Sequence, residues 1–411
     1  MTYFSSSQFA SAAASGNDWR EVAKTVLEDL SEAKTSEDSF NLGFLYISDM
    51  LADDAESILN LFKSVLNIDH WVGGIGIGIC ANGQSFIDKP AISAMVGKFD
   101  SEDYCLFPPI NQEPEKAANT LNAWLDNNDP MLVLATGDPM TDEDPSHILR
   151  TLEAQCSGFM IGGLTSSRTH HAQFAGELYS GGLCGAVFSS AIPVASILSQ
   201  GCIPIGTSHT VTKCDGHEIH TLDERDALEV FEEDLRSMVI KKIDRDPDTI
   251  PIDEDALDDP SAIPEEFHSL VKGEVHAAVP VSESDQNDFL VRNIIGVNND
   301  NNAVTISQHV SNGDRIMFVY RDHDSVYEDL STQLLSLRER VQKDTGTFEP
   351  KGALYISCAA RAFNEFEDGQ KNEMQLIHEI IGDVPLTGFY AGGEINKARL
   401  YGYTGILTLF L

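Results

Sequence analysis

Charged side chains of opposite sign follow glycine-bearing or strand-like stretches of this chain. Arg168 ends the segment GGLTSSR, Arg361 ends SCAAR, and Glu394 comes directly after Gly392 and Gly393. A guanidinium can bind a carboxylate through two parallel hydrogen bonds, and a carboxylate can pair with an ammonium group. These residue types therefore point to a site for a small zwitterion such as an amino acid. The alternative is that the same side chains form structural ion pairs.

Hydroxyl groups and glycines accompany these charges. The serines can supply hydrogen bonds, whereas the glycines favour close packing of strands over direct contact with a ligand. We expect no catalytic residue and no metal ligand among them. The candidate ligand-binding residues are Gly162, Gly163, Ser166, Ser167, Arg168, Gln200, Gly201, Cys202, Ser357, Cys358, Arg361, Gly393 and Glu394.

Two cysteines suggest a different chemistry. Cys202 lies in QGCIP, and Cys358 lies in ISCAAR, three residues before Arg361. A nucleophilic cysteine needs a neighbouring His or Arg that lowers the pKa of its thiol. No Cys-His-Asp signature accompanies either residue, so we expect a non-catalytic protein and keep a cysteine-dependent enzyme as the alternative. The 7 cysteines also lack CxxC spacing, which argues against a disulfide framework or a zinc knuckle.

Histidines suggest a third chemistry, because a single imidazole can bind haem iron. The sequence contains no CxxCH motif for covalent haem attachment, and no HExxH, P-loop or dinucleotide-binding pattern. We therefore expect no cofactor, with haem held by one axial histidine as the alternative. The histidines considered are His170, His171, His209, His217 and His220.

The elements that must position these residues recur three times. A strand-like run is followed by a helical pattern, such as Ile58, Phe62 and Leu66, then by a glycine pair and a closing strand. The aligned glycine pairs are Gly73-Gly74, Gly162-Gly163 and Gly392-Gly393. The closing strands read AISAMVGKF, LCGAVFS and YTGILTLFL. The pattern predicts an α/β (α+β-like) fold of repeated β-α-β-β units in layered mixed sheets, with two related halves. It also predicts that residues 404–411 form an interior strand.

Charge and hydropathy exclude several classes of function. The 411 residues include 65 Asp and Glu against 27 Lys and Arg, for a formal net charge of -38. Such a chain repels nucleic acids and anionic membranes. No apolar run is long enough to span a bilayer, and no basic segment followed by an apolar one opens the sequence. We therefore expect a cytoplasmic protein that binds neither nucleic acid nor membrane.

Several motifs, in this order, resemble the FIST family, in which N-terminal and C-terminal FIST domains are paired in bacterial signal-transduction proteins. The resemblance runs from about residue 40 to residue 411. It implies an intracellular sensory module for a small ligand, with amino acids proposed, and some relatives are haem-binding nitric oxide sensors. The motifs are GFLYISDMLADDAESIL, HWVGGIGIGICANG, GGLTSSR, SQGCIPIG, LVRNIIGV, GALYISCAAR and VPLTGFYAGGEINKARLYGYTG.

The resemblance also implies a domain order, and the sequence departs from the family pattern at one position. We expect a leader with one amphipathic helix at 1–39, a FIST N-terminal domain at 40–243, an acidic, proline-containing linker at 244–268 and a FIST C-terminal domain at 269–411. Many relatives carry Asn-Gly where this chain has Gly392 and Gly393, so an amide is lost here. No kinase, cyclase or methyl-accepting segment is recognisable.

These observations predict a signal-transduction protein that binds a small ligand, an amino acid, in a pocket between the FIST N and FIST C halves. It would act through a separate signalling protein such as a histidine kinase. The alternatives are a haem-binding nitric oxide sensor that regulates a histidine kinase, and an enzyme with Cys358 or Cys202 as nucleophile.

Overall fold

The chain folds into mixed sheets flanked by helices, which confirms the predicted α/β class. The computed structural model describes residues 3–6, 8–33, 40–110, 114–245, 275–282, 285–363 and 372–411. Two compact units result: one combines residues 1–200 with 329–411, and the other consists of residues 201–328. The second unit is therefore an insertion within the sequence of the first.

The first unit contains one succession of elements three times, which confirms and extends the predicted repeat. The first repeat comprises β2 (Phe9–Ser15), α1 (Trp19–Glu32), β3 (Leu42–Ser48), α2 (Ala55–Leu66), β4 (His70–Gly76) and β7 (Ala91–Gly97). The second comprises β8 (Tyr104–Phe107), α3 (Pro114–Leu125), β9 (Pro130–Gly137), α4 (Pro145–Gln155), β10 (Phe159–Leu164) and β13 (Leu183–Ser189). The third comprises β14 (Val194–Ser199), α7 (His323–Thr345), β23 (Gly352–Cys358), α9 (Glu373–Ile381), β24 (Leu386–Ala391) and β27 (Gly405–Phe410).

Each repeat forms its own sheet in the same way. The central strand, β3, β9 or β23, is parallel to the next strand and antiparallel to the closing strand. The closing strand also pairs with the outer strand, β2, β8 or β14. Strand β27 is thus hydrogen-bonded on both sides, which confirms that residues 405–410 form an interior strand.

The repeats exchange β-hairpins with one another. The hairpin of β5 (Gly78–Ala81) and β6 (Gln84–Ile87) follows β4 but extends the third sheet through β24. The hairpin of β11 (Gln173–Ala175) and β12 (Glu177–Tyr179) follows β10 but extends the first sheet through β4. The hairpin of β25 (Glu394–Asn396) and β26 (Arg399–Tyr401) follows β24 but extends the second sheet through β10. Every sheet therefore depends on two repeats.

Strand register corrects the alignment of the glycine pairs. Gly73 pairs with Leu45, Gly162 with Ala135, and Gly388 with Tyr355. A Cβ at any of these three glycines would overlap the carbonyl oxygen of the paired residue. The third counterpart of Gly73 and Gly162 is thus Gly388, whereas the sequence pattern aligned them with Gly392. The pair at 392–393 instead lies between β24 and β25.

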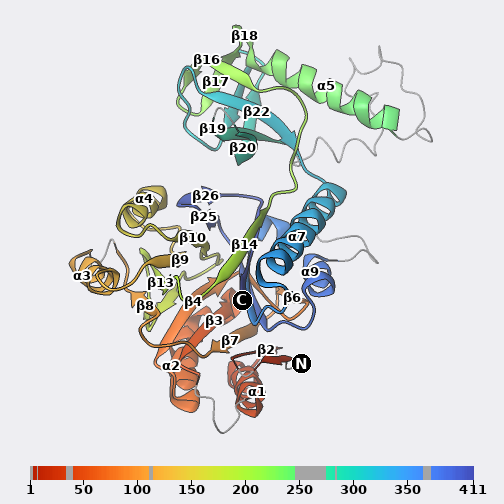
Figure 1. Cartoon of the computed structure of the whole chain (residues 1–411). Helices are drawn as coiled ribbons and strands as arrows, with labels where there is room; N and C mark the ends of the chain where they lie inside the picture. The colour runs from red at the N-terminus through yellow and green to blue at the C-terminus, as the bar shows by residue number, and fades with distance from the viewer. Residues whose placement is uncertain are drawn as a thin grey trace. The chain divides into compact units, whose positions relative to one another are not determined.

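The inner faces of the three sheets share one core, with helices on the outside. Aromatic rings from different repeats meet there, as Phe9 with Phe410 at 5.2 Å and Phe44 with Phe188 at 6.5 Å between ring centroids. Helices α1 and α2 cover the outer face of the first sheet, and α3 and α4 cover that of the second (Figure 1). Helix α1 is the amphipathic helix expected near the N-terminus. The first strand, β1 (Tyr3–Ser6), pairs with the outer edge of β2.

The second unit is an antiparallel barrel. Strand β22 pairs with both β16 and β19, which closes the strand order β22-β16-β17-β21-β20-β19. The acidic linker expected at 244–268 lies outside the described residues except for residues 244 and 245. The elements of this unit are β15 (Ile203–Pro204), β16 (His209–Asp215), β17 (Glu218–Leu222), β18 (Arg225–Asp226), α5 (Ala227–Arg245), β19 (Val275–Ser282), β20 (Asp285–Asn298), β21 (Ala303–Ile306) and β22 (Arg315–Tyr320).

The register predicts that two glycines of the third repeat differ in whether they tolerate a side chain. We expect Gly388→Ala to lower the free energy of unfolding by several kcal/mol, about as much as an overpacked core, because the new methyl would displace the backbone of β23. Gly393→Ala is the matched control, since its Cβ would meet Leu164 Cδ1 at an ordinary 3.6 Å. Urea unfolding of both variants gives the comparison. Equal stabilities would contradict the assigned register.

Candidate functional site

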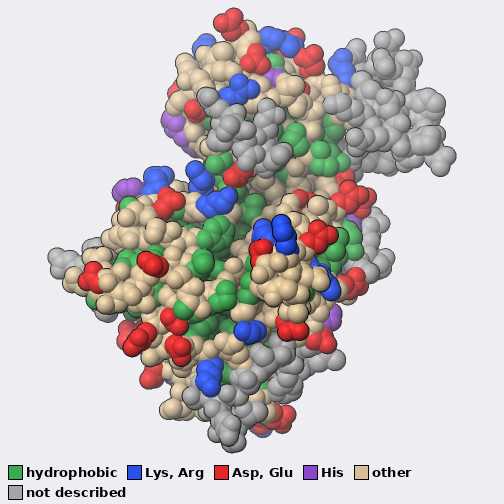
Figure 2. Space-filling view, in the orientation of Figure 1, with side chains coloured by type: hydrophobic (Ala, Val, Ile, Leu, Met, Phe, Trp, Pro, Cys, Tyr) green, Lys and Arg blue, Asp and Glu red, His purple; other side chains and the backbone are tan. Residues whose placement is uncertain are grey.

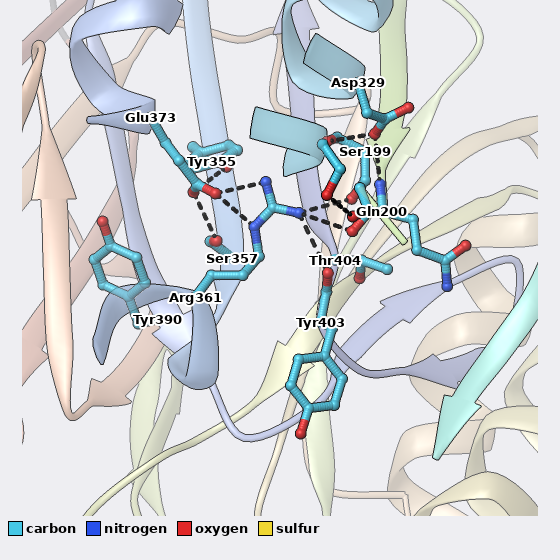
Figure 3. A network of polar contacts seen from close by, with 12 residues as sticks. Ser199, Gln200, Asp329, Tyr355, Ser357, Arg361, Glu373, Tyr390, Tyr403 and Thr404 are labelled. Carbon is cyan, nitrogen blue, oxygen red and sulfur yellow. Dashed lines mark hydrogen bonds and ion pairs between the residues drawn. The ribbon is translucent and has the colours of Figure 1, made fainter. Parts of the chain in front are cut away.

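A buried polar network surrounds Arg361 at the end of β23. Arg361 lies on the short helix α8 (Ala359–Phe363), and its side chain is enclosed. Its Nε and Nη2 face Glu373 Oε1 at 2.6 and 2.5 Å, as Figure 3 shows. Its Nη1 donates to the carbonyl oxygens of Ser199 and Tyr403, each at 3.2 Å. The guanidinium that could bind a ligand carboxylate is thus paired with Glu373, through a single carboxylate oxygen.

Glu373 is the residue that sequence reasoning missed. It occupies the first turn of α9, where Asn372 and Gln375 form a capping box that marks the helix start. Its Oε2 accepts hydrogen bonds from Tyr355 Oη at 2.8 Å and Ser357 Oγ at 3.1 Å. Burial, together with this carboxylate, raises the pKa of Tyr355 well above its ordinary value. Burial alone would lower the pKa of Arg361, but the Glu373 carboxylate raises it overall.

Gln200 joins this network through its backbone. Asp329 Oδ2, on α7, accepts from Ser199 Oγ and from Gln200 N, both at 2.8 Å. The Gln200 carbonyl oxygen lies 3.5 Å from Arg361 Nη1. The structure therefore brings together three of the predicted residues, Gln200, Ser357 and Arg361, around the end of β14 and β23 (Figure 3).

Glu394 is a second buried carboxylate, with 0% of its surface exposed. Its Oε2 accepts from Thr404 N at 3.0 Å and from Thr404 Oγ1 at 2.8 Å, and the Cys358 thiol is also a hydrogen-bond partner of the carboxylate. Within the described chain, its Oε1 has no hydrogen-bond partner. Burial raises the pKa of Glu394 to about 7, although Thr404, Cys358 and more distantly Arg361 pull it down in part.

The predicted glycines hold Glu394 in place. Strand β25 pairs with β10, so that Glu394 lies opposite Gly163 and Ile395 opposite Gly162. Leu164 N also donates to the Gly393 carbonyl oxygen at 2.8 Å. A Cβ at Gly163 would lie 2.7 Å from Ala391 Cβ, and one at Gly162 would overlap Ala135. These glycines therefore serve close packing of strands.

The other predicted residues lie apart from this network. Ser166 Oγ donates to the Tyr390 carbonyl oxygen and accepts from Ile77 N at 2.8 Å, which links the chain at the ends of β4, β10 and β24, one strand from each repeat. Ser167 Oγ accepts from Thr169 N at 3.1 Å.

Arg168 pairs with the acidic side chains of Asp49 and Asp88, and its side chain is 41% exposed. Its guanidinium is thus engaged by carboxylates of the protein itself.

Gly201 and Cys202 belong to the second compact unit. Gly201 has a φ of +66°, and its carbonyl oxygen accepts from Ser325 Oγ at 2.9 Å. Cys202 is partly exposed.

The surroundings of Cys358 oppose its activation as a nucleophile. Burial first, and the Glu394 carboxylate second, raise the pKa of this thiol to about 12. A reactive cysteine needs the opposite shift. The neighbouring Arg361 is engaged by Glu373.

Most of the histidines considered for haem have other partners. His209 places Nδ1 2.7 Å from Asp223 Oδ2 and Nε2 3.1 Å from Asp234 Oδ2, so neither ring nitrogen faces an open coordination position. The hydrogen bond to Asp234 raises the pKa of His209 against the opposing effect of burial. His171 Nδ1 lies 3.0 Å from Thr165 Oγ1, and His217 Nδ1 lies 3.1 Å from the Ile306 carbonyl oxygen. Exposed His170 faces Asp53 at 3.4 Å.

Comparison with known proteins places this arrangement in a family. Residues 41–225 match the FIST N domain, and residues 227–397 match the FIST C domain. The chain belongs to the FIST family. FIST domains are sensory domains of signal-transduction proteins. In FIST terms, the N segment supplies Gly163 and Gln200 to the site, and the C segment supplies Arg361 and Glu394.

Similar proteins occur in mycobacteria. An uncharacterized protein of Mycobacterium tuberculosis is 28% identical over 239 residues, which are 57% of this chain and 55% of the relative. An uncharacterized protein of Mycobacterium bovis is 30% identical over 222 residues, which are 52% of this chain and 50% of the relative. The matches thus span about half the length of these curated relatives. Within the described residues, no helix has the length and apolar character needed to cross a membrane.

The Arg361–Glu373 pair predicts strong dependence on both partners. We expect Arg361→Ala or Glu373→Ala to lower the free energy of unfolding by about 3–5 kcal/mol, since each leaves a buried charge without its partner. The double variant Arg361→Met with Glu373→Leu should be less costly than either single change. Arg225→Ala, which removes an exposed pair with Glu233, is the control and should leave the free energy of unfolding almost unchanged. If the single variants changed the free energy of unfolding as little as the control does, the pair would not be important for stability.

Burial of Glu394 predicts a pH dependence of stability. Its pKa of about 7 in the folded protein lies above the value of about 4.3 for an exposed Glu, so the folded state retains a proton that the unfolded chain has released. The free energy of unfolding should therefore fall between about pH 4.5 and 7, by roughly 3 kcal/mol in total. Glu394→Gln should remove this fall, whereas exposed Glu349→Gln should keep it. Chemical denaturation across that pH range is the measurement, and parallel curves for wild type and Glu394→Gln would contradict the assignment.

Proposed function

We propose that this FIST protein is a non-catalytic sensor of a small, amino-acid-like ligand and passes its state to a separate signalling protein. The site lies where the FIST N and FIST C segments meet around Glu394. The observation that carries the proposal is the fully buried Glu394 Oε1, which lacks a donor in the described chain. A ligand ammonium group can provide the missing hydrogen bond and the opposite charge.

Energetics support this reading of Glu394. A buried carboxylate oxygen without a donor costs free energy, so such a group calls for an explanation, and a bound ligand is one. A carboxylate that titrates near pH 7 is also typical of functional sites. The neighbouring Gly392 and Gly393 carry no side chains, so neither can supply a side-chain donor to Glu394.

Arg361 has a different role in this proposal from the one its sequence suggested. A ligand carboxylate would have to compete with Glu373 for the guanidinium, and breaking a buried pair costs several kcal/mol. Arg361 instead holds the carbonyl of Tyr403, and hence the segment that carries Thr404, against the end of β14. We therefore assign ammonium recognition to Glu394 and support of its surroundings to Arg361.

Titration calorimetry with each of the twenty amino acids tests the proposal. We expect at least one to bind, and Glu394→Gln to weaken its affinity by about ten- to a hundredfold, as loss of one charge-assisted hydrogen bond implies. Glu349→Gln is the matched control and should bind as wild type does.

Two results would contradict this proposal. If none of the twenty amino acids binds, the ligand is not an amino acid. If Glu394→Gln binds as tightly as wild type, the ligand binds elsewhere. A Soret band after addition of haemin to the purified protein would favour the haem-sensor alternative instead.

A further inference from the structure

The outer edge of the third sheet is open along β14. In the described chain, β14 is the last strand of its sheet and pairs only with β27, from Val194 opposite Phe410 to Ser199 opposite Gly405. A groove of about 300 Å³ runs beside this edge, and Val194, Ala195 and Ser196 line it. Met131 and Phe159 form its apolar side, and α7 contributes Arg340, Val341 and Asp344.

The space-filling view shows the character of this face. Hydrophobic side chains form a band over the region of β14, next to charged side chains over α7 (Figure 2). The groove therefore combines an unpaired strand edge, apolar walls and charges at one side, which are the features that bind an extended peptide.

The internal repeat identifies the kind of occupant. Leu42 of β3 pairs with Gly97, which pairs with Phe9 of β2. In the third repeat, Gly352 of β23 pairs with Phe410, which pairs with Val194 of β14. The residues of β2 from 9 to 11 are therefore the structural counterparts of residues 194 to 196.

In the first repeat, a strand already occupies that position. Strand β1 pairs antiparallel with the outer edge of β2, with Tyr3 opposite Ser11, Phe4 opposite Ala10 and Ser6 opposite Phe9. The groove of the third repeat is lined by the counterparts of these three β2 residues. It lies where an added strand would run.

The backbone of β14 is able to receive such a strand. Arg340 Nη2 donates to the Ser196 carbonyl oxygen at 2.9 Å, which shows that this carbonyl faces away from β27. In a strand, the N–H of the same residue points to the same side, so Ser196 offers both groups to an antiparallel partner. A charged side chain at a strand edge is one way in which proteins keep the edge from pairing, so an added strand has to displace this guanidinium.

We propose that the β14 edge binds an extended segment of a partner protein by antiparallel strand addition. The segment presents apolar side chains to Met131, Phe159 and Val341, and a basic side chain to Asp344. The net charge of -38 attracts a basic segment and repels a second copy of this chain. The proposal rests on the proposed signalling through a separate protein, but it does not depend on the small ligand.

A peptide that carries the β1 sequence between basic ends is the probe. It is fluorescein-labelled Lys-Lys-Tyr-Phe-Ser-Ser-Lys-Lys. Fluorescence anisotropy should show saturable binding to the wild-type protein. Ser196→Pro should weaken it at least about tenfold, because proline removes the outward N–H yet is tolerated on an edge strand. Ser196→Ala is the matched control, because it loses only the hydroxyl and should bind as wild type does.

Hydrogen exchange of the wild-type protein gives an independent readout if Ser196→Pro does not fold. The peptide should protect the outward-facing amides of residues 194, 196 and 198 and leave those of residues 9–15 unchanged. A peptide with glutamates in place of its lysines should bind at least about tenfold more weakly at low salt.

Four results would overturn the inference. They are absence of peptide binding, equal affinity of Ser196→Pro and wild type, protection at β2 instead of β14, and dimerisation in analytical ultracentrifugation that Ser196→Pro abolishes. The ligand calorimetry uses no variant of the β14 edge, so the two results can be told apart. Failure of peptide binding leaves the Glu394 site intact, and failure of the ligand leaves this edge to be tested.

Discussion

Backbone pairing between strands from distant parts of the chain is the constraint on which the first unit depends. The glycines of β4, β10 and β24 make this pairing possible, since a side chain at Gly73, Gly162 or Gly388 would push against the carbonyl of the neighbouring strand. The hairpin that leaves each of these strands then completes another sheet. As a result, each sheet in the described chain includes a hairpin from another repeat, and the FIST N and FIST C segments are held together by hydrogen bonds as well as by the shared aromatic core.

The candidate site is a product of the same exchange. Glu394 lies against the second repeat because β25 pairs with β10. Arg361 follows β23 and donates to the Ser199 carbonyl oxygen at the end of β14. The two carboxylates there have different environments: both oxygens of Glu373 are bonded, whereas Glu394 is bonded through Oε2. The charge of Glu373 is therefore stabilised by Arg361, whereas the charge of Glu394 depends on pH. Elsewhere in the protein, exposed acidic groups are in excess, and these two buried carboxylates differ from them.

Local patterns in the sequence predicted the elements well, because each pattern depends on near neighbours. Helical spacing at Ile58 and Phe62 marks α2, and the apolar run from Gly405 marks β27. The hairpin exchange was not predictable in this way, since a short hairpin has the same pattern whichever sheet it joins. The glycine alignment failed for a related reason: what singles out Gly388 is the Tyr355 carbonyl on another strand. Arg361 and Arg168 were recognised as binding groups, but their partners were not, because Asp49 lies 119 residues from Arg168 and no pattern links such positions.

The inserted barrel has a consequence for how the chain reaches its fold. Strand β5 must find β24, and β14 must find β27, across more than the length of the barrel, so the first unit has a high contact order. The barrel is built from residues close in sequence and can form before those partners are synthesised. During synthesis, the apolar strands of the first two repeats are made before the third repeat. Until then they lack the hairpin and the sheet that the third repeat supplies, and chains in such a state aggregate or recruit chaperones. A strongly acidic chain is suited to that interval, because mutual repulsion keeps partly folded molecules apart.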